Sequence, residues 1–401
     1  PIILEKTGYK YYIEKNAAKN LNLTLSSPQV LTLQLKKFQS GLQSDFSNHK
    51  LRLVIPVDTL PPLDIFDFKS LKINDSVKVS GLIETTVNKS DYHLFIHKND
   101  DTDQKFIFID SLKKTNLNTF KEACKAIITA VGYICGNLYL GEYYYQTIKE
   151  ESENITLTEH TYYEELEESA ITNHALFDPF QFNQYYKPIQ EKNNLKEVPY
   201  SISKLSFSTL CNKILTNGSF SRCCRFIIEG NQSKQLLLRA GILSIALETM
   251  TTIIYEENKE KINPIEDKSL AKVIRERFQS VVNEYSQFIT DYGQTILSAK
   301  IADINKPTNS KKLSKPFEIL GIKLSKEDIS ILNHRNKFLH GTSPVSENEE
   351  IELRLIISRI ELMLNRLILK YIGYSGHIIN YYAWIQKNSK REITDHPFKI
   401  I

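Results

Sequence analysis

Three polar residues over six positions have the side chains needed for acid–base chemistry beside a bound anion: Arg335, Asn336 and His340. Arginine stays charged at physiological pH, and its planar donors match phosphate oxygens. Histidine titrates near neutrality, so His340 can give or take a proton in a general acid–base step. Asn336 can hydrogen-bond a phosphate or orient His340.

The residues around this group predict a helix with an apolar stripe, and Arg335 lies near the middle of that stripe. The stripe consists of Ile331, Leu332, Phe338 and Leu339. A charge on an apolar face must be paired, bound to a ligand or placed at an interface open to water. His340 precedes Gly341, which suits a helix C-terminus, and lies roughly 140° around the helix from Arg335. Either the helix end unwinds, or Arg335 and His340 meet across two copies of the chain.

A purely structural role is the alternative for both residues. Arg335 could pair with Glu248, which interrupts an apolar run, and His340 could stabilise a helix C-terminus. A second pair with the same spacing, Arg391 and His396, lies beside Pro397 in a terminal segment and is interpreted as chance.

An Arg-Asn pair separated from a His by three residues, at the end of a short helix between longer amphipathic helices, resembles the R-x(4–6)-H signature of HEPN domains. These domains are small helical bundles, and many are metal-independent ribonucleases with a composite active site at a homodimer interface. The resemblance implies that Arg335, Asn336 and His340 are catalytic and that no metal or cofactor is required. It also implies two partners: an RNA substrate, with tRNA as one candidate, and a second copy bound through the HEPN domain.

A second resemblance concerns the N-terminal part. Strand-like segments are followed by a helix that ends in Gly132-Tyr133-Ile134-Cys135-Gly136 and an aromatic cluster. This arrangement is similar to the N-terminal region of ApeA-type bacterial abortive-infection proteins. It implies a cytoplasmic anti-phage defence protein, with a phage-derived trigger acting at the N-terminal domain. The alternatives are a non-catalytic HEPN scaffold that binds RNA or protein, and a toxin held by an antitoxin.

Hydrophobic periodicity predicts an α+β protein: a β-rich N-terminal domain followed by an all-α HEPN bundle. The predicted boundaries are 1–115 for the β-rich domain, 116–200 for a helical and acidic/aromatic connector packed on it, 201–375 for the HEPN domain and 376–401 for the tail. Predicted strands are 31–35, 51–55, 77–83, 93–97 and 106–109. A change to helical spacing is expected from 116.

Four segments of the C-terminal half have clear expectations. Helices are predicted at 234–258, at 269–290, from Ser325 through the motif, and at 348–373, with a polar loop at 306–315. The second helix should face inward through Val273, Phe278, Val281, Val282, Tyr285 and Phe288. Ser325 followed by Asp328 is close to a capping box.

Charge is distributed unevenly along the chain. Residues 1–200 hold 22 Lys/Arg and 26 Asp/Glu, whereas residues 201–401 hold 29 and 21, so the halves carry −4 and +8. A basic half fits a polyanion partner. Eight glutamates between 150 and 168, with no Lys or Arg from 150 to 186, predict a solvated linker or helix face, or a segment that restrains the basic half.

Several common site types are absent from the sequence. The five Cys contain no C-x-x-C, which argues against a disulfide framework or a zinc site and fits a reducing cytoplasm. His93 and His97 are about 13 Å apart on one strand, too far to share a metal. The chain also lacks a Walker A sequence, a Rossmann glycine pattern and G-x-S-x-G. The apolar runs near 126–141 and 240–254 are interrupted by polar residues, so no membrane span is predicted.

Overall fold

The computed structural model describes residues 2–6, 9–13, 18–24, 30–40, 43–74, 77–151, 154–166, 170–171, 173–176, 184, 187–192, 201–346, 349–392, 396 and 398–401. The architecture is α+β, as predicted: an antiparallel sheet precedes a helical region. We refer to residues 2–176 as the sheet region and residues 201–401 as the helical region.

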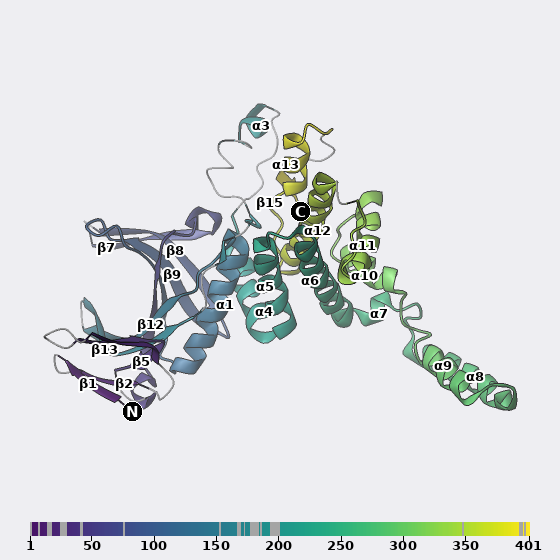
Figure 1. Cartoon of the computed structure of the whole chain (residues 1–401), viewed down its shortest axis with the longest axis horizontal. Coiled ribbons are helices and arrows are strands. Elements are labelled where there is room, and N and C mark those ends of the chain that lie inside the picture. Colours follow the sequence, from purple (N-terminus) through teal and green to yellow (C-terminus); the bar gives the residue numbers. More distant parts are fainter. Residues whose placement is uncertain are drawn as a thin grey trace.

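The main sheet has ten strands in the order β1-β2-β5-β13-β12-β6-β10-β9-β8-β7 (Figure 1). Their bounds are β1 Ile2–Lys6, β2 Tyr9–Ile13, β5 Lys37–Gln39, β6 Lys50–Val57, β7 Phe68–Asn74, β8 Val77–Val87, β9 Ser90–Lys98, β10 Lys105–Ser111, β12 Glu142–Glu151 and β13 Asn154–Glu165. Alternation explains the strands: in β6, Leu51, Leu53 and Ile55 are buried while their neighbours are only partly covered. Strands β3 (Ala18–Thr24) and β4 (Val30–Leu35) form a separate hairpin. Short pairs form between β11 (Asn137–Leu138) and β14 (Ala170–Ile171), and between β15 (His377–Ile379) and β16 (Phe398–Ile400).

Helix α1 (Leu117–Cys135) lies between the sheet and the helical region (Figure 1). Asn116 caps its start by accepting a hydrogen bond from the Thr119 N–H, and Gly136 ends it with φ of 66°. The Phe120 ring packs on Tyr92 of β9 and edge-on to Tyr145 of β12. The helix therefore covers the sheet with one face and leaves the other for the helical region.

The sheet extends beyond residue 115, where the β-rich domain was expected to end. Strands β12 and β13 lie inside the sheet, between β5 and β6, although 116–200 was predicted to be a helical and acidic connector. Tyr143 and Tyr145 alternate inward and are buried, and this period of two is partly hidden by the adjacent tyrosine between them. The acidic segment up to residue 165 is therefore largely strand rather than linker or helix face. Its residues 152–153 and 167–168, and most of 177–200, lie outside the described residues.

The helical region contains α4 Lys204–Thr216, α5 Gly218–Gln232, α6 Leu236–Glu257, α7 Lys259–Ile262, α8 Lys268–Glu284, α9 Asp291–Ala302, α10 Asn309–Ile319, α11 Lys326–Leu339, α12 Glu350–Tyr371 and α13 Tyr381–Asn388. The helices predicted at 234–258, around the motif and at 348–373 are confirmed as α6, α11 and α12. Helix α6 packs against α5, α10, α11 and α12. Its length and mean hydropathy of 1.5 would also suit a membrane span, and half of that window is buried within the structure.

Two predictions in this region were wrong. The loop expected at 306–315 is largely α10, which Thr308 caps. The helix expected at 269–290 is present as α8, which begins at Lys268 with Asp267 as its cap and ends earlier, at Glu284; the expectation that its apolar face lies inward was wrong. Helices α8 and α9 instead form a hairpin that projects from the end of the molecule opposite the sheet (Figure 1). We call residues 267–303 the arm.

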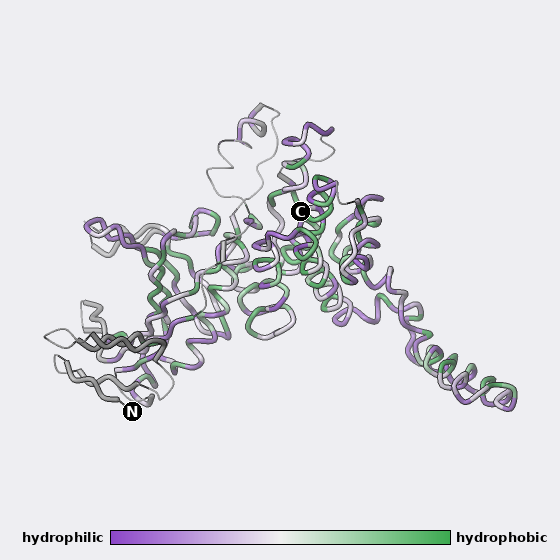
Figure 2. The backbone as a smooth tube through the Cα atoms, viewed as in Figure 1, coloured by the Kyte–Doolittle hydropathy of each residue, from purple (hydrophilic) through white to green (hydrophobic). Residues whose placement is uncertain are grey.

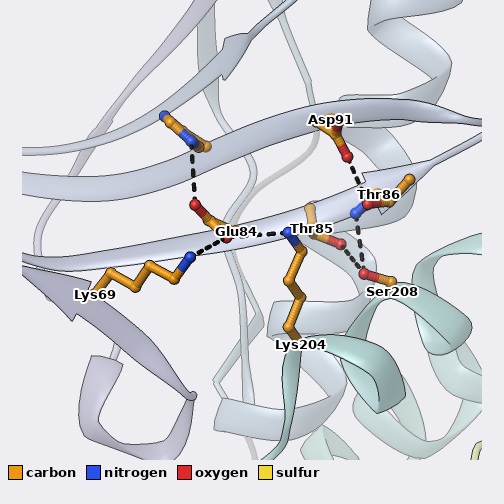
Figure 3. A network of polar contacts seen from close by, with 8 residues as sticks. Lys69, Glu84, Thr85, Thr86, Asp91, Lys204 and Ser208 are labelled. Atoms are coloured by element: carbon orange, nitrogen blue, oxygen red, sulfur yellow. Dashed lines mark hydrogen bonds and ion pairs between the residues drawn. The ribbon is translucent and has the colours of Figure 1, made fainter.

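The sheet region and the helical region share one continuous hydrophobic core. At the contact of α4 with β8, Lys204 reaches Glu84 at 3.0 Å (Figure 3). The Ser208 and Thr85 hydroxyls lie 3.2 Å apart. Deeper inside, the Tyr133 hydroxyl of α1 donates to the amide oxygen of Asn365 on α12, at 3.0 Å.

A buried carboxylate adds a second connection between the regions. Glu361 of α12 accepts hydrogen bonds from Asn173, from Asn231 of α5 and from Arg239 of α6. Burial raises the pKa of Glu361, and these donors oppose that effect only in part. Side chains from four separate segments thus meet at one carboxyl group in the core.

Candidate active site

The start of α11 is fixed by a capping box and an ion pair. The Ser325 hydroxyl accepts from the Asp328 N–H, and Asp328 accepts from the Ser325 N–H at 2.8 Å. The capping-box expectation is thereby confirmed, with Asp in place of the usual Glu. Asp328 also accepts from the Arg359 Nε of α12 at 2.6 Å, and both side chains are buried. The ring of Tyr382 lies 4.8 Å from the Arg359 guanidinium.

Burial alone would raise the pKa of Asp328, but the hydrogen bonds from Arg359 and Ser325 outweigh it and hold this pKa below its usual value. The carboxylate is therefore charged at neutral pH. Together these contacts bind the helix with the candidate residues to α12 and α13.

The end of α11 is a Schellman motif. The Thr342 N–H donates to the Lys337 carbonyl at 2.8 Å, and the Gly341 N–H donates to the Phe338 carbonyl at 3.0 Å. Gly341 has φ of 70°, a conformation that only glycine adopts without strain. His340 is the last residue before this turn and is solvent-exposed.

Arg335 faces α6 and is buried, with 7% of its surface exposed. Its Nη1 donates to the Asn336 side-chain oxygen at 2.9 Å. Its Nη2 lies 3.9 Å from the carboxylate of Glu248, which is half-exposed on α6. Its Nε has no hydrogen-bond partner among the described residues. The pairing with Glu248 considered from the sequence is therefore present, but it leaves most of the guanidinium donors unused.

No hydrogen bond or ion pair joins Arg335 to His340 within the described chain. Helix α11 stays regular through Leu339, so the side chains diverge by roughly 140°. Of the two possibilities that the sequence left open, the unwound helix end does not occur. The structure therefore brings Arg335 and Asn336 together and places His340 apart from them.

The Asp328–Arg359 pair was missed by sequence reasoning, although a signal existed. Arg359 interrupts the apolar face of α12, and a charge on a buried face must have a partner. The same signal drew attention to Arg335. Glu361, two residues after Arg359 on the same helix, could have been found in this way as well.

The other histidines, tyrosines and cysteines considered from the sequence are strand residues or pack within the fold. His93 is partly buried and His97 is exposed on β9. Tyr382 is buried against the bundle, and the Tyr381 hydroxyl accepts from the His174 N–H. All five cysteines are buried thiols. Among the described residues, no three His, Cys, Asp or Glu side chains gather as a metal-binding group.

Comparison with known proteins adds no relative. No family model, curated protein or solved structure matches this chain. The HEPN assignment and the likeness to ApeA-type proteins therefore stay predictions.

One cavity lies next to the candidate site, and a second lies between the sheet and the helical region. One, of about 520 Å³, runs along α6 and includes Glu248, Glu256 and Glu257. The other, of about 740 Å³, lies between α1 and strands β12 and β13, and is lined by Lys121, Tyr143 and Arg225 among others. Because Arg225 belongs to α5, the larger cavity touches both regions.

Proposed function

We propose that this protein is a metal-independent endoribonuclease of the HEPN type that acts in bacterial anti-phage defence by abortive infection. Arg335, Asn336 and His340 are its catalytic residues, and a second copy of the chain completes the site. The observation that carries the proposal is the guanidinium of Arg335, which is buried yet uses few of its donors. Such a group is costly to a fold, and an anionic ligand would satisfy it.

The charge around α11 supports an RNA substrate. Residues 309–340 contain seven Lys/Arg and three Asp/Glu, so this short stretch carries +4, as much as the entire chain. Lys311, Lys323 and Lys337 are exposed on it. Positive charge of this kind attracts a phosphate backbone whatever its sequence.

RNA supplies its own nucleophile, the 2′-hydroxyl next to each phosphate. One His340 would take the 2′-hydroxyl proton as that oxygen attacks phosphorus, and the second copy's His340 would protonate the departing 5′-oxygen. The products are a 2′,3′-cyclic phosphate and a 5′-hydroxyl. Each proton transfer contributes about 10²–10⁴-fold, and Arg335 stabilises the charge that builds on the non-bridging oxygens.

Regulation by the sheet region is the second part of the proposal. The 740 Å³ cavity is lined by both regions, and the shared core connects them to α12, which holds α11 through Asp328. A phage-derived trigger bound at the sheet region has a packed route to the catalytic helix. Cytoplasmic location follows from this role.

A non-catalytic scaffold is the alternative that one observation favours. The groove along α6 contains Glu248, Glu256 and Glu257 against a single cation, Arg222, so its net negative charge would attract a basic peptide rather than RNA. In that role Arg335 is a structural partner of Glu248, and His340 takes part in no reaction.

His340→Ala separates the two functions, and His334→Ala is the matched control on the same helix. We expect the wild-type chain to cleave RNA in the presence of a chelator and to leave 2′,3′-cyclic phosphate ends. His340→Ala should lose at least 100-fold in cleavage rate while keeping its oligomeric mass, and His334→Ala should keep activity. Undiminished cleavage by His340→Ala, or growth arrest in cells that persists without cleavage, would refute the nuclease.

A further inference from the structure

The arm exposes five of the six side chains that the sequence predicted to face inward on the helix expected at 269–290. Of the nineteen large apolar side chains that are exposed in the described part of the chain, nine lie in the arm. They are Leu270, Val273, Phe278, Val281, Tyr285, Phe288, Tyr292, Ile296 and Leu297. Phe288 and Tyr292, at the tip, are each 77% exposed. Figure 2 shows apolar positions running along both helices of the arm.

The arm has almost no interior of its own. Ala271 is the one buried residue of α8, and α9 has none. Helices of this length owe most of their stability to the packing of an apolar face. A hairpin with a periodic apolar face and no core is therefore incomplete without a surface to cover it.

The charge of the arm favours a second copy of the same chain. Residues 267–303 carry five Lys/Arg and five Asp/Glu, which cancel, so two arms do not repel each other. Residues 267–285 carry four Lys/Arg against three Asp/Glu, and residues 291–303 carry one against two, so the α8 side is +1 and the α9 side −1. In a two-fold pair that sets α8 of one copy against α9 of the other, these opposite charges would face each other. A polyanion would find no net attraction here.

The amount of apolar surface is also sufficient. At roughly 150–250 Å² for each fully exposed large side chain, the nine expose on the order of 900 Å². A stable protein–protein interface buries about 800 Å² per partner. Two helical hairpins that pack face to face make a four-helix bundle, which would cover most of this surface.

We propose that the arm is the self-association surface of this protein and that two arms pair as a four-helix bundle. The arm leaves the helical region beside α10 and α11, so pairing holds two copies together on the side that carries the candidate site (Figure 1). The arm contact depends on burial and charge alone. That it serves catalysis rests on the proposed function.

The test uses the full chain and the double variant Phe288→Ser/Tyr292→Ser. Both side chains are exposed in the single chain, so its fold does not depend on them. The matched control is Leu205→Ser/Leu238→Ser, which removes two exposed apolar side chains outside the arm. Sedimentation or light scattering should give twice the chain mass of 46.3 kDa for the wild type and the control. The dimer dissociation constant should rise at least 30-fold in the arm variant.

Hydrogen exchange supplies the second readout, because amides of α8 and α9 should become more protected as wild-type concentration rises. A monomeric wild type, a dimer that the arm variant leaves intact, or arm amides indifferent to concentration would each overturn the proposal. Cleavage measured in parallel separates this proposal from the nuclease. If the arm variant is monomeric but still cleaves RNA, the arm contact is supported and the composite dimer site is refuted. If the wild type is a dimer through the arm but does not cleave RNA, only the nuclease proposal is refuted.

Discussion

At the scale of single residues, the contact between Arg335 and Glu248 determines how many guanidinium donors are available to a ligand. The guanidinium is buried, but the carboxylate that faces it is half-exposed and 3.9 Å away, beyond hydrogen-bond distance. An ion pair this long, with one partner half-exposed, contributes little, because water and salt screen the open carboxylate. Glu248 therefore lies opposite the Arg335 charge without binding its donors, and under the proposed function a phosphate would displace it.

Glu248→Gln should tighten RNA binding about two- to fivefold, since it removes a competitor worth no more than an exposed ion pair. Binding to a non-cleaved RNA analogue at fixed ionic strength measures this. Glu256→Gln, in the same groove but without a contact to Arg335, should change affinity less. Weaker binding by Glu248→Gln would mean that the carboxylate positions Arg335 rather than competing for it.

At the scale of elements, α11 is attached to the bundle at its N-terminal end rather than at the end that carries the candidate residues. Asp328 takes part in the capping box and in the buried pair with Arg359, whereas His340 lies at the exposed end beyond a Schellman turn. A helix fixed at one end transmits position along its length with little loss, because its backbone bonds are internal. Asp328 and Arg359 are therefore positioning residues for the site.

Asp328→Ala should destabilise the protein by about 3–5 kcal/mol, because it leaves the Arg359 charge buried without its carboxylate. Urea denaturation measures this. The control is Glu350→Ala, which breaks the exposed Arg354–Glu350 pair and should cost under about 0.5 kcal/mol. Equal effects of the two variants would show that the buried pair has no special role.

The same pair predicts a pH dependence. Since the pKa of Asp328 is lowered on folding, its contribution is fully present above the unfolded value of about 3.9 and is lost as the pH falls through the folded value. Asp328→Asn should therefore flatten the loss of stability below about pH 4. A variant with the wild-type acid profile would contradict this.

At the scale of the whole molecule, the sheet region and the helical region behave as one packed body with an arm. Helix α1 lies between them, its Tyr133 reaches Asn365 of α12, and Glu361 collects donors from three other segments. Buried polar links of this kind are costly to break, because each leaves an unsatisfied group. Sheet and helices are therefore expected to unfold together.

Tyr133→Phe should lower the free energy of unfolding by about 1–3 kcal/mol, since it deprives the buried Asn365 oxygen of its donor. The fluorescence of Trp384, the single tryptophan, reports on the helical region, and far-UV circular dichroism reports on the whole chain. Both transitions should coincide and shift together. Tyr144→Phe, whose hydroxyl bonds Glu142 near the surface, is the control. Two separate transitions would show that the regions fold independently.

The sequence by itself determined what depends on local spacing. Ser325 and Asp328 predicted the start of α11, Gly341 predicted its end, and the strand-like patterns predicted β4, β6, β8, β9 and β10, because caps, turns and amphipathic periods are properties of neighbouring residues. The divergence of Arg335 and His340 follows from the same helical geometry.

Only the tertiary structure decided which faces are covered and by what. It placed the acidic segment in β12 and β13, paired Asp328 with Arg359, set Glu248 opposite Arg335, and turned the apolar face of α8 outward. An apolar stripe specifies that a face must be buried, but it carries no information about which surface, in this chain or in a second copy, will bury it.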